Sequence, residues 1–368
     1  MIKVAHVMRW YLAQPETFIW QYLHKFERVY PVVIAETLQN LSQFPLPAGK
    51  VYRTYGPRLT QPWLMDNWYR RVLKRPLGFM ERIMRREGVR VVHAHFGPMG
   101  CKCLPVALSL RIPLITNYYG YDLSMSRVVE QNKAAYVELF RRGHHFLVEG
   151  PRMRERLISL GCSPEKVSIQ RIAIDLEQYT FNPPLAPENR SVRLLFVGRM
   201  VEKKGLEYAL RALAKIKEGR GFQFRIIGSG ELEKSLRLLA LDLGLSEKVE
   251  WLGMQPHRKV IEELRNCHIL IQPSVTAKNG DSEGGAPTTI LEAQACGVPV
   301  VSTLHADIPY VTRPDESALL APERDVEHLS ENVRYLMDHP ETWSRMGKMG
   351  RQHVEQFHDV AKEVVTLE

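Results

Sequence analysis

Short β-branched runs alternate with helical patterns along almost the whole chain, and this alternation restricts the fold more than any other feature. The order starts with the run at 2–8 and restarts with the run at 192–198, after the proline-rich segment 181–191. Apolar runs of about four to eight residues between amphipathic helices indicate parallel strands joined by crossover helices. We therefore predict an α/β protein of two doubly wound, Rossmann-like domains, at 1–185 and 186–352.

The pattern also places the individual elements. In the first half we expect strands at 2–8, 30–36, 89–96, 112–122 and 144–150, an extended segment at 167–174, a loop at 40–62, and helices through about 63–88, 98–110, 129–142 and 151–161. In the second half we expect strands at 192–198, 222–228, 249–253, 268–274 and 298–303, each followed by a helical pattern or a turn. Gly and Pro interrupt these patterns at the expected boundaries.

The stretch 279–303, NGDSEGGAPTTILEAQACGVPVVST, predicts a loop, a helix, a turn and a buried strand. Pro287 stands at the helix start, and Gly297 and Pro299 stand past its end, which is the usual asymmetry of helix termini. The free N–H groups of such a loop and the positive end of the helix can bind an anion. Glu283 and Glu292 flank this position and can accept hydrogen bonds from hydroxyl groups. Phosphate with hydroxyls indicates a nucleotide-sugar, although many glycine-rich loops only turn the chain.

Two other strand ends of the second half carry residues suited to phosphate. Arg199 and Lys204 follow the run 192–198, and Gly228 and Gly230 follow the next strand. Arginine and lysine bind phosphate, and glycine lets a flat ring or a backbone come close. Alternatively, the two cations pair with Glu202 or Glu231. The carboxyl ends of parallel strands share one sheet edge, so we expect one pocket lined by Gly198, Arg199, Lys204, Gly228, Gly230, Glu283, Gly284, Gly285, Ala286, Pro287, Thr288 and Glu292.

Composition and cysteine usage are those of a cytoplasmic globular enzyme. The chain has 368 residues, of which 45% are hydrophobic and 25% charged. We expect no signal peptide, because the first residues run directly into a strand pattern. No run approaches the roughly 18 apolar residues of a membrane span. The five cysteines are odd in number and mostly in apolar surroundings, which favours reduced thiols.

Positive charge is concentrated in the first half. Residues 1–190 hold 27 Lys and Arg against 15 Asp and Glu, whereas residues 191–368 hold 23 against 26. The segment 69–90 has eight basic residues, interleaved with and preceded by apolar ones at helical spacing. It is either a solvated helix face or a surface for anionic lipid headgroups. A nucleic-acid surface is a third hypothesis, but no nucleic-acid motif supports it.

Four motifs in order, GRMVEKKG, IIGSGE, VEWLG and SEGGAPTTILEAQACGVPVV, make the chain resemble the retaining glycosyltransferases of family 4, which have the GT-B fold. The resemblance covers nearly the whole chain and implies two domains facing across a cleft, with a last helix at 353–368 that packs back on the first domain. It implies transfer of a sugar from a UDP- or GDP-sugar. Arg199 and Lys204 would hold the diphosphate, Glu292 the ribose and Glu283 the hydroxyls of the sugar. The segments 272–274 and 305–309 resemble family positions near the nucleotide.

The chain departs from the family pattern in two places. Eight residues separate Glu283 from Glu292, where the family usually has seven, and the additional residue lies within 284–286. Tyr119 stands where many members have the His of a His-Gly-x-Asp motif, and Asp122 follows it. A phenol with a reference pKa near 10 is a weak base at neutral pH. Tyr119 and Asp122 are therefore either positioning groups or parts of a structural turn.

The first domain is expected to bind the acceptor. Glu16 resembles a family position that faces it, although a carboxylate at a helix start is the alternative; we also place His95 on the acceptor side. Candidate catalytic residues are Arg199, Lys204, Glu283, Tyr119 and Asp122. We expect front-face transfer without a cofactor or metal, because the sequence has no Asp-x-Asp motif, and His93, His95, Cys101 and Cys103 suit strand and helix ends.

The expected acceptor is a glycan or a lipid-linked glycan, as in bacterial cell-surface polysaccharide synthesis. The enzyme would then be cytoplasmic and peripheral on the inner face of the plasma membrane, with no nucleic-acid partner. Two alternatives remain. One is a nucleotide-sugar epimerase or hydrolase of the same fold. The other is a two-lobed solute-binding protein, which would need an export signal.

Overall fold

The structure, a computed structural model, describes residues 1–11, 17–42, 44–46, 48–54, 68, 78–188, 191–218 and 221–368. The chain divides into two compact units, and each is described by itself. Unit 1 comprises Met1–Leu123, Arg127–Ala173 and Val360–Glu368, and unit 2 comprises Ser124–Ser126 and Ile174–Asp359.

The division falls at Ala173 and Ile174, before the proline-rich segment at which the sequence places it. That segment is attached to unit 2. The N–H of Asn182 donates to the carbonyl of Cys296 at 3.0 Å, and a Cβ on Gly297 would lie only 2.8 Å from the ring of Phe181. A polar, proline-rich composition marks an irregular backbone, and here this backbone lies against one of the two units.

Unit 1 contains a seven-stranded sheet in the order β3-β2-β1-β4-β5-β6-β7. Every neighbouring pair is parallel. The order reverses between β1 and β4, as in Rossmann folds. Both faces of β1 are buried: Ala5 and Val7 join one core cluster, and Met8 and Tyr11 join another. The strands are β1 (Ile2–Tyr11), β2 (Val29–Leu38), β3 (Lys50–Arg53), β4 (Val91–His95), β5 (Leu114–Asn117), β6 (His145–Val148) and β7 (Val167–Ile169).

Unit 2 repeats this arrangement with a six-stranded sheet in the order β10-β9-β8-β11-β12-β13. Its neighbouring strands are also parallel, and the order reverses between β8 and β11. The prediction of two doubly wound parallel sheets is therefore confirmed. The strands are β8 (Val192–Val197), β9 (Phe222–Ile227), β10 (Val249–Gly253), β11 (Ile269–Gln272), β12 (Val300–Thr303) and β13 (Ala318–Ala321).

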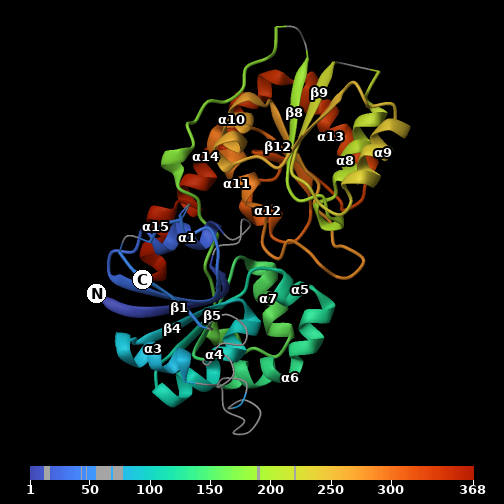
Figure 1. Ribbon diagram of the computed structural model, residues 1–368. Helices are drawn as coiled ribbons and strands as arrows, with labels where there is room; N and C mark the ends of the chain where they lie inside the picture. Colours follow the sequence, from blue (N-terminus) through green and yellow to red (C-terminus); the bar gives the residue numbers. More distant parts are fainter. Residues whose placement is uncertain are drawn as a thin grey trace. The chain divides into compact units, whose positions relative to one another are not determined.

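Helices cover both faces of each sheet (Figure 1). In unit 2, α8, α9 and α13 lie on one side, and α10, α11 and α14 lie on the other. The helices are α1 (Thr17–Leu23), α3 (Phe79–Glu87), α4 (Gly97–Leu110), α5 (Tyr121–Ser124), α6 (Ser126–Arg142), α7 (Pro151–Ser159), α8 (Leu206–Lys215), α9 (Glu233–Asp242), α10 (His257–Asn266), α11 (Thr288–Cys296), α12 (Ile308–Val311), α13 (Val326–Asp338), α14 (Trp343–Phe357) and α15 (Val360–Leu367).

The sequence missed β3 and β13, two of the four outermost strands of the described sheets. Residues 40–62 were expected to form a loop, but β3 lies within this range and pairs with β2. Its four residues are exposed or half-buried, so the apolar pattern of an inner strand is absent. The helices expected through 63–88 are represented in the described residues by α3, and most of the remaining range lies outside them.

The expected last helix at 353–368 is in fact two helices. α14 ends at Phe357, and the carbonyl of His358 accepts the N–H of Ile174 at 2.9 Å. α15 begins at Val360 and belongs to unit 1. There, one carboxylate oxygen of Glu368 accepts the backbone N–H groups of three consecutive residues, Glu27, Arg28 and Val29, at 2.8, 2.7 and 3.1 Å. The break between the helices therefore coincides with the change from one unit to the other.

Two further findings concern membrane spans and cysteines. Among the helices described, none combines the length and the apolar composition that a bilayer span requires. All five cysteines carry free thiols, and four of them are buried.

In unit 2, α11 and α14 approach each other at glycines. A Cβ added to Gly347 would lie 2.1 Å from the carbonyl oxygen of Gly297. Gly297 itself ends α11 with φ +85°, where glycine has no steric penalty. The two helices can therefore pack this closely only without a side chain at position 347.

We predict that Gly347→Ala destabilises the protein by about 1–3 kcal/mol, the usual cost of overpacking. In an exposed helix the same change would stabilise by up to about 1 kcal/mol, so the sign separates the two effects. Urea unfolding of the variant and the wild type measures the change in the free energy of unfolding. The control is Gly221→Ala, whose added Cβ would meet its nearest neighbour at 3.8 Å; equal stability of the two variants would contradict the prediction.

Candidate functional site

The candidate site lies at the carboxyl ends of β8 and β11, the neighbouring strands between which the strand order of unit 2 reverses. Ligands of doubly wound sheets bind at this position. Gly198 and Arg199 follow β8, and Ser274 follows β11 closely. Crossover connections in opposite directions leave these strand ends uncovered, so the topology brings together residues that are far apart in the sequence.

A buried ion pair joins the two strand ends. Lys204 Nζ lies 2.9 Å from Glu283 Oε2, with the two side chains 14% and 6% exposed. The hydroxyl of Ser274 donates to Glu283 Oε1 at 2.6 Å. Burial alone would raise the pKa of Glu283, but the charges of Lys204 and Lys203 outweigh it and lower this pKa below its ordinary value. Glu283 is therefore an ionised carboxylate with a cation on one oxygen and a hydroxyl on the other.

Lys203, the neighbour of Lys204, fixes the start of the same loop. Its Nζ lies 3.1 Å from Asp281 Oδ1 and donates to the carbonyl of Ser282 at 2.8 Å. The two consecutive lysines thus hold two carboxylates two residues apart. The sequence left open that Arg199 and Lys204 pair with Glu202 or Glu231; in the described part of the chain neither of them does.

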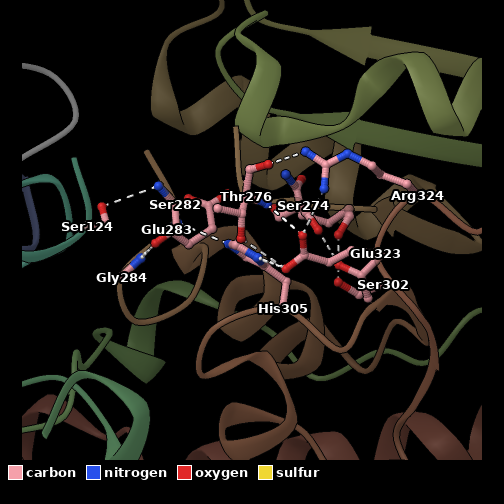
Figure 2. Close-up of polar contacts among 12 residues, drawn as sticks. Ser124, Ser274, Thr276, Ser282, Glu283, Gly284, Ser302, His305, Glu323 and Arg324 are labelled. Atoms are coloured by element: carbon pink, nitrogen blue, oxygen red, sulfur yellow. Dashed lines mark hydrogen bonds and ion pairs between the residues drawn. The ribbon is translucent and has the colours of Figure 1, made fainter. Parts of the chain in front are cut away.

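His305 supports the backbone of the loop from the other side (Figure 2). The N–H of Glu283 donates to His305 Nε2 at 3.1 Å, so the second nitrogen, Nδ1, carries the proton and donates to Glu323 Oε1 at 2.7 Å. Glu323 also accepts the N–H of Thr276 at 2.8 Å. His305 belongs to the segment 305–309 that the sequence placed near the nucleotide, and its contacts here position Glu283.

The first turn of α11 is open to an anion. Pro287 precedes the helix in an extended conformation, and α11 begins at Thr288. Within the described part of the chain, no group accepts the N–H of Gly285, Ala286, Thr288 or Thr289. Unpaired amides at the positive end of a helix attract negative charge. Gly284 has a φ of +80° and lies in the 284–286 turn, where the sequence places the additional residue.

Arg199 is exposed at the end of β8. Its guanidinium makes no ion pair or hydrogen bond with any described side chain, and its charge contributes to lowering the pKa of Lys204, after the larger effect of burial. Two positive side chains therefore lie near each other, and only Lys204 is neutralised by a carboxylate of the protein.

The backbone of the loop after β8 lies directly against Gly228 and Gly230. The sequence had left open whether a flat ring or a backbone comes close to them. A Cβ on Gly228, whose φ is +133°, would lie 1.9 Å from the carbonyl oxygen of Gly198, and one on Gly230 would lie 2.5 Å from that of Met200. The loops after β8 and β9 thus touch backbone to backbone, and Met200 N–H donates to the carbonyl of Ser229 at 2.8 Å. These glycines permit the loop after β8 to adopt its path.

Glu292, on α11, belongs to a second cluster of polar side chains, together with Tyr179 and His257. Its Oε1 accepts the hydroxyl of Tyr179 at 3.1 Å and lies 3.2 Å from His257 Nε2. This hydrogen bond raises the pKa of His257 above its ordinary value. Tyr179 and His257 were missed by sequence analysis. They precede Glu292 by 113 and 35 residues, and no local pattern links them to it.

In unit 1, Asp122 acts through the backbone. Its carboxylate is fully buried and accepts the N–H groups of Gly97 at 2.9 Å and Tyr119 at 3.1 Å. Burial raises the pKa of Asp122 to about 6. The residue joins the 119–122 turn to the start of α4, which agrees with the structural turn that the sequence left as one alternative; its candidate catalytic role stays a prediction. The hydroxyl of Tyr119 lies 2.7 Å from His95 Nδ1. Glu16 lies outside the described residues.

Comparison with known proteins agrees with this architecture. Residues 21–178 match the family described as Glycosyltransferase Family 4, and residues 180–353 match Glycosyl transferases group 1. WcaL of Escherichia coli K12, assigned as a colanic acid biosynthesis glycosyltransferase, is 35% identical over 280 residues, which are 75% of this chain and 68% of that protein. AmsK of Erwinia amylovora, an amylovoran biosynthesis glycosyltransferase, is 35% identical over 218 residues, 59% of this chain and 53% of its own length.

A solved structure shares the fold over the whole chain. The crystal structure of Anabaena HepE in complex with UDP superposes with a TM-score of 0.81 and covers 100% of this chain and 98% of its own, at 15% identity. With the two parallel sheets and the two family matches, this places the chain in glycosyltransferase family 4, with the GT-B fold.

Proposed function

We propose that the protein transfers a sugar from a UDP- or GDP-sugar to a glycan or lipid-linked acceptor, with retention at the anomeric carbon. The observation that carries the proposal is the combination, in unit 2, of Arg199, Lys204 and the unpaired amides at the start of α11. These groups suit a diphosphate. The UDP bound to HepE, a protein of the same fold, further supports a nucleotide donor.

In the proposed reaction, negative charge grows on the departing diphosphate as the glycosidic bond breaks. Arg199, Lys204 and the amides of α11 stabilise this charge without having to reorganise. Glu283 binds hydroxyls of the donor sugar through the lone pairs that Lys204 and Ser274 leave open. Glu292, held by Tyr179 and His257, binds the ribose.

Transfer then takes place on the front face of the donor, and a donor phosphate oxygen takes the proton of the acceptor hydroxyl. The acceptor oxygen forms the new glycosidic bond as the bond to the diphosphate breaks, and no metal is used in this step. Unit 1 supplies the acceptor side, where Tyr119 and His95 are hydrogen-bond groups.

The names of WcaL and AmsK support a role in cell-surface polysaccharide synthesis. We place the protein in the cytoplasm, peripheral on the inner face of the plasma membrane, without a nucleic-acid partner. In α3, contact with lipid would rest on charge, whereas Trp68, which precedes the basic segment, is an exposed aromatic residue. The apolar residues Ile83 and Met84 of α3 are buried in the core of unit 1, whereas Arg82, Arg86 and Arg90 are exposed.

The proposed reaction is tested by incubating the protein, dialysed against EDTA, with radiolabelled UDP- and GDP-sugars, with and without lipid-linked acceptor glycans. We expect acceptor-dependent transfer, a retained anomeric configuration, and no rate increase on addition of Mn2+ or Mg2+. Donor that is epimerised or hydrolysed equally without acceptor would instead indicate an epimerase or hydrolase. Binding of sugars without any turnover would indicate a binding protein.

We predict that Arg199→Ala lowers kcat by about 100-fold or more, the effect of removing one donor to developing charge. The unfolding midpoint should not change, because this guanidinium is exposed and makes no ion pair among the described residues. Arg211→Ala is the matched control, since Arg211 is exposed and pairs only within its helix, with Glu207. Equal activity of the two variants would remove Arg199 from the proposed site.

Flotation with liposomes tests the membrane contact. The protein should float with anionic liposomes at low salt and be released at about 1 M salt, where the Debye length is about 3 Å. Changing Arg82, Arg86 and Arg90 together to Gln should weaken flotation. The control changes three exposed arginines of unit 2 to Gln: Arg211, Arg237 and Arg258. Equal loss of flotation in the two triple variants would contradict a specific lipid-binding surface at these arginines. A wild-type protein that does not float at low salt would contradict membrane contact altogether.

A further inference from the structure

Three histidine side chains meet inside unit 1. His6 lies on β1, and His93 and His95 lie on the adjacent strand β4. His6 and His93 are directly opposite in the parallel register. The three side chains are 2%, 4% and 4% exposed. Their rings stack or tilt against one another with centroids 4.6–5.5 Å apart.

The spacing of their nitrogens suits one shared ion. One candidate ligand nitrogen from each ring lies within 4.8 Å of those of the other two. His6 Nδ1 and His95 Nε2 are 3.2 Å apart. Zn2+ binds imidazole nitrogen at about 2.0–2.1 Å with tetrahedral geometry, so two nitrogens on one ion are roughly 3.4 Å apart. His6 and His95 already have about this separation, and the site requires ring rotation to shorten the remaining separations, which are up to 4.8 Å.

Neighbouring side chains prepare two of the histidines as ligands. His93 Nε2 lies 2.9 Å from Asn117 Oδ1, which can only accept, so Nδ1 keeps the lone pair. His95 Nδ1 lies 2.7 Å from the Tyr119 hydroxyl, which leaves Nε2 for an ion. Such outer partners orient histidine ligands and select the tautomer in metal sites.

The cluster also has an unexplained polar atom. His6 Nδ1 lies next to His95. The other ring nitrogen, Nε2, is buried and has no hydrogen-bond partner among the described residues, which is rare for a native interior. A cavity of about 20 Å³, lined in part by the three histidines, lies beside the cluster. This volume has room for one water or one ion.

We propose that His6, His93 and His95 bind one transition-metal ion, Zn2+ by their ligand chemistry, with a water in the cavity as fourth ligand. Three neutral nitrogens without a carboxylate suit Zn2+ and not Mg2+ or Ca2+. The ion would tie β1 to β4 and fix His95 as a donor to Tyr119. The metal site shares His95 and Tyr119 with the proposed acceptor side, but metal binding is measured without sugar transfer, so its failure can be distinguished from failure of the proposed function.

The test uses the full-length protein stripped with a chelator and then titrated with ZnSO4 or, as a spectroscopic probe, CoCl2. We expect one saturable equivalent, a higher unfolding midpoint with Zn2+, and the visible absorption of four-coordinate Co2+. His6→Gln should weaken binding more than tenfold. Asn117→Ala, which removes only an outer partner, should weaken it about 10–100-fold. The control His145→Gln removes a half-buried histidine of unit 1 that bonds to Ser168 and should bind like the wild type.

Each outcome decides the proposal. Saturable binding in the wild type and His145→Gln, with weaker binding in His6→Gln or Asn117→Ala, supports it. A wild-type protein that takes up no equivalent of either metal overturns it, as does a His6→Gln variant that binds as tightly as the wild type. If His6→Gln does not fold, Asn117→Ala and the wild-type Co2+ spectrum decide, and a six-coordinate spectrum counts against the site.

Discussion

The buried pair of Lys204 and Glu283 is the interaction on which the candidate site depends. An ionised carboxylate in the interior is unfavourable unless a cation and hydrogen bonds compensate for lost solvation. Here Lys204 lies 2.9 Å away, and Ser274 supplies a hydroxyl at 2.6 Å. The pair therefore holds the connection after β8 against the loop after β11. Because Lys204 is already neutralised while Arg199 is not, the two cations differ in the charge they can offer an anion.

Around this pair, side chains and neighbouring loops hold several backbone groups in place. His305 accepts a hydrogen bond from the N–H of Glu283 and donates one to the carboxylate of Glu323. The glycines at 228 and 230 let the neighbouring loops touch directly. In contrast, four amides at the start of α11 have no partner in the described part of unit 2. A rigid loop with a few open donors is the arrangement that binds an anion with little loss of entropy.

Sequence analysis anticipated the inner parts of the fold better than its edges. The central strands β1 and β8 are buried on both faces and have long apolar runs, so their pattern is clear. The edge strand β3 has four exposed or half-buried residues and gives no such pattern. The candidate site shows the same limit. Glu283, Lys204 and Pro287 stand in local motifs, whereas Tyr179 and His257 reach Glu292 only through the fold.

The sequence by itself determined the two α/β repeats, the helix that begins after Pro287, and the residue types at the strand ends, because hydrophobic period and turn chemistry are local properties. Only the tertiary structure decided which side chains meet. It paired Lys204 with Glu283, turned Asp122 onto the amides of Gly97 and Tyr119, and brought His6 beside His93 and His95. Such contacts follow from strand order and register, which are set by packing across the whole sheet.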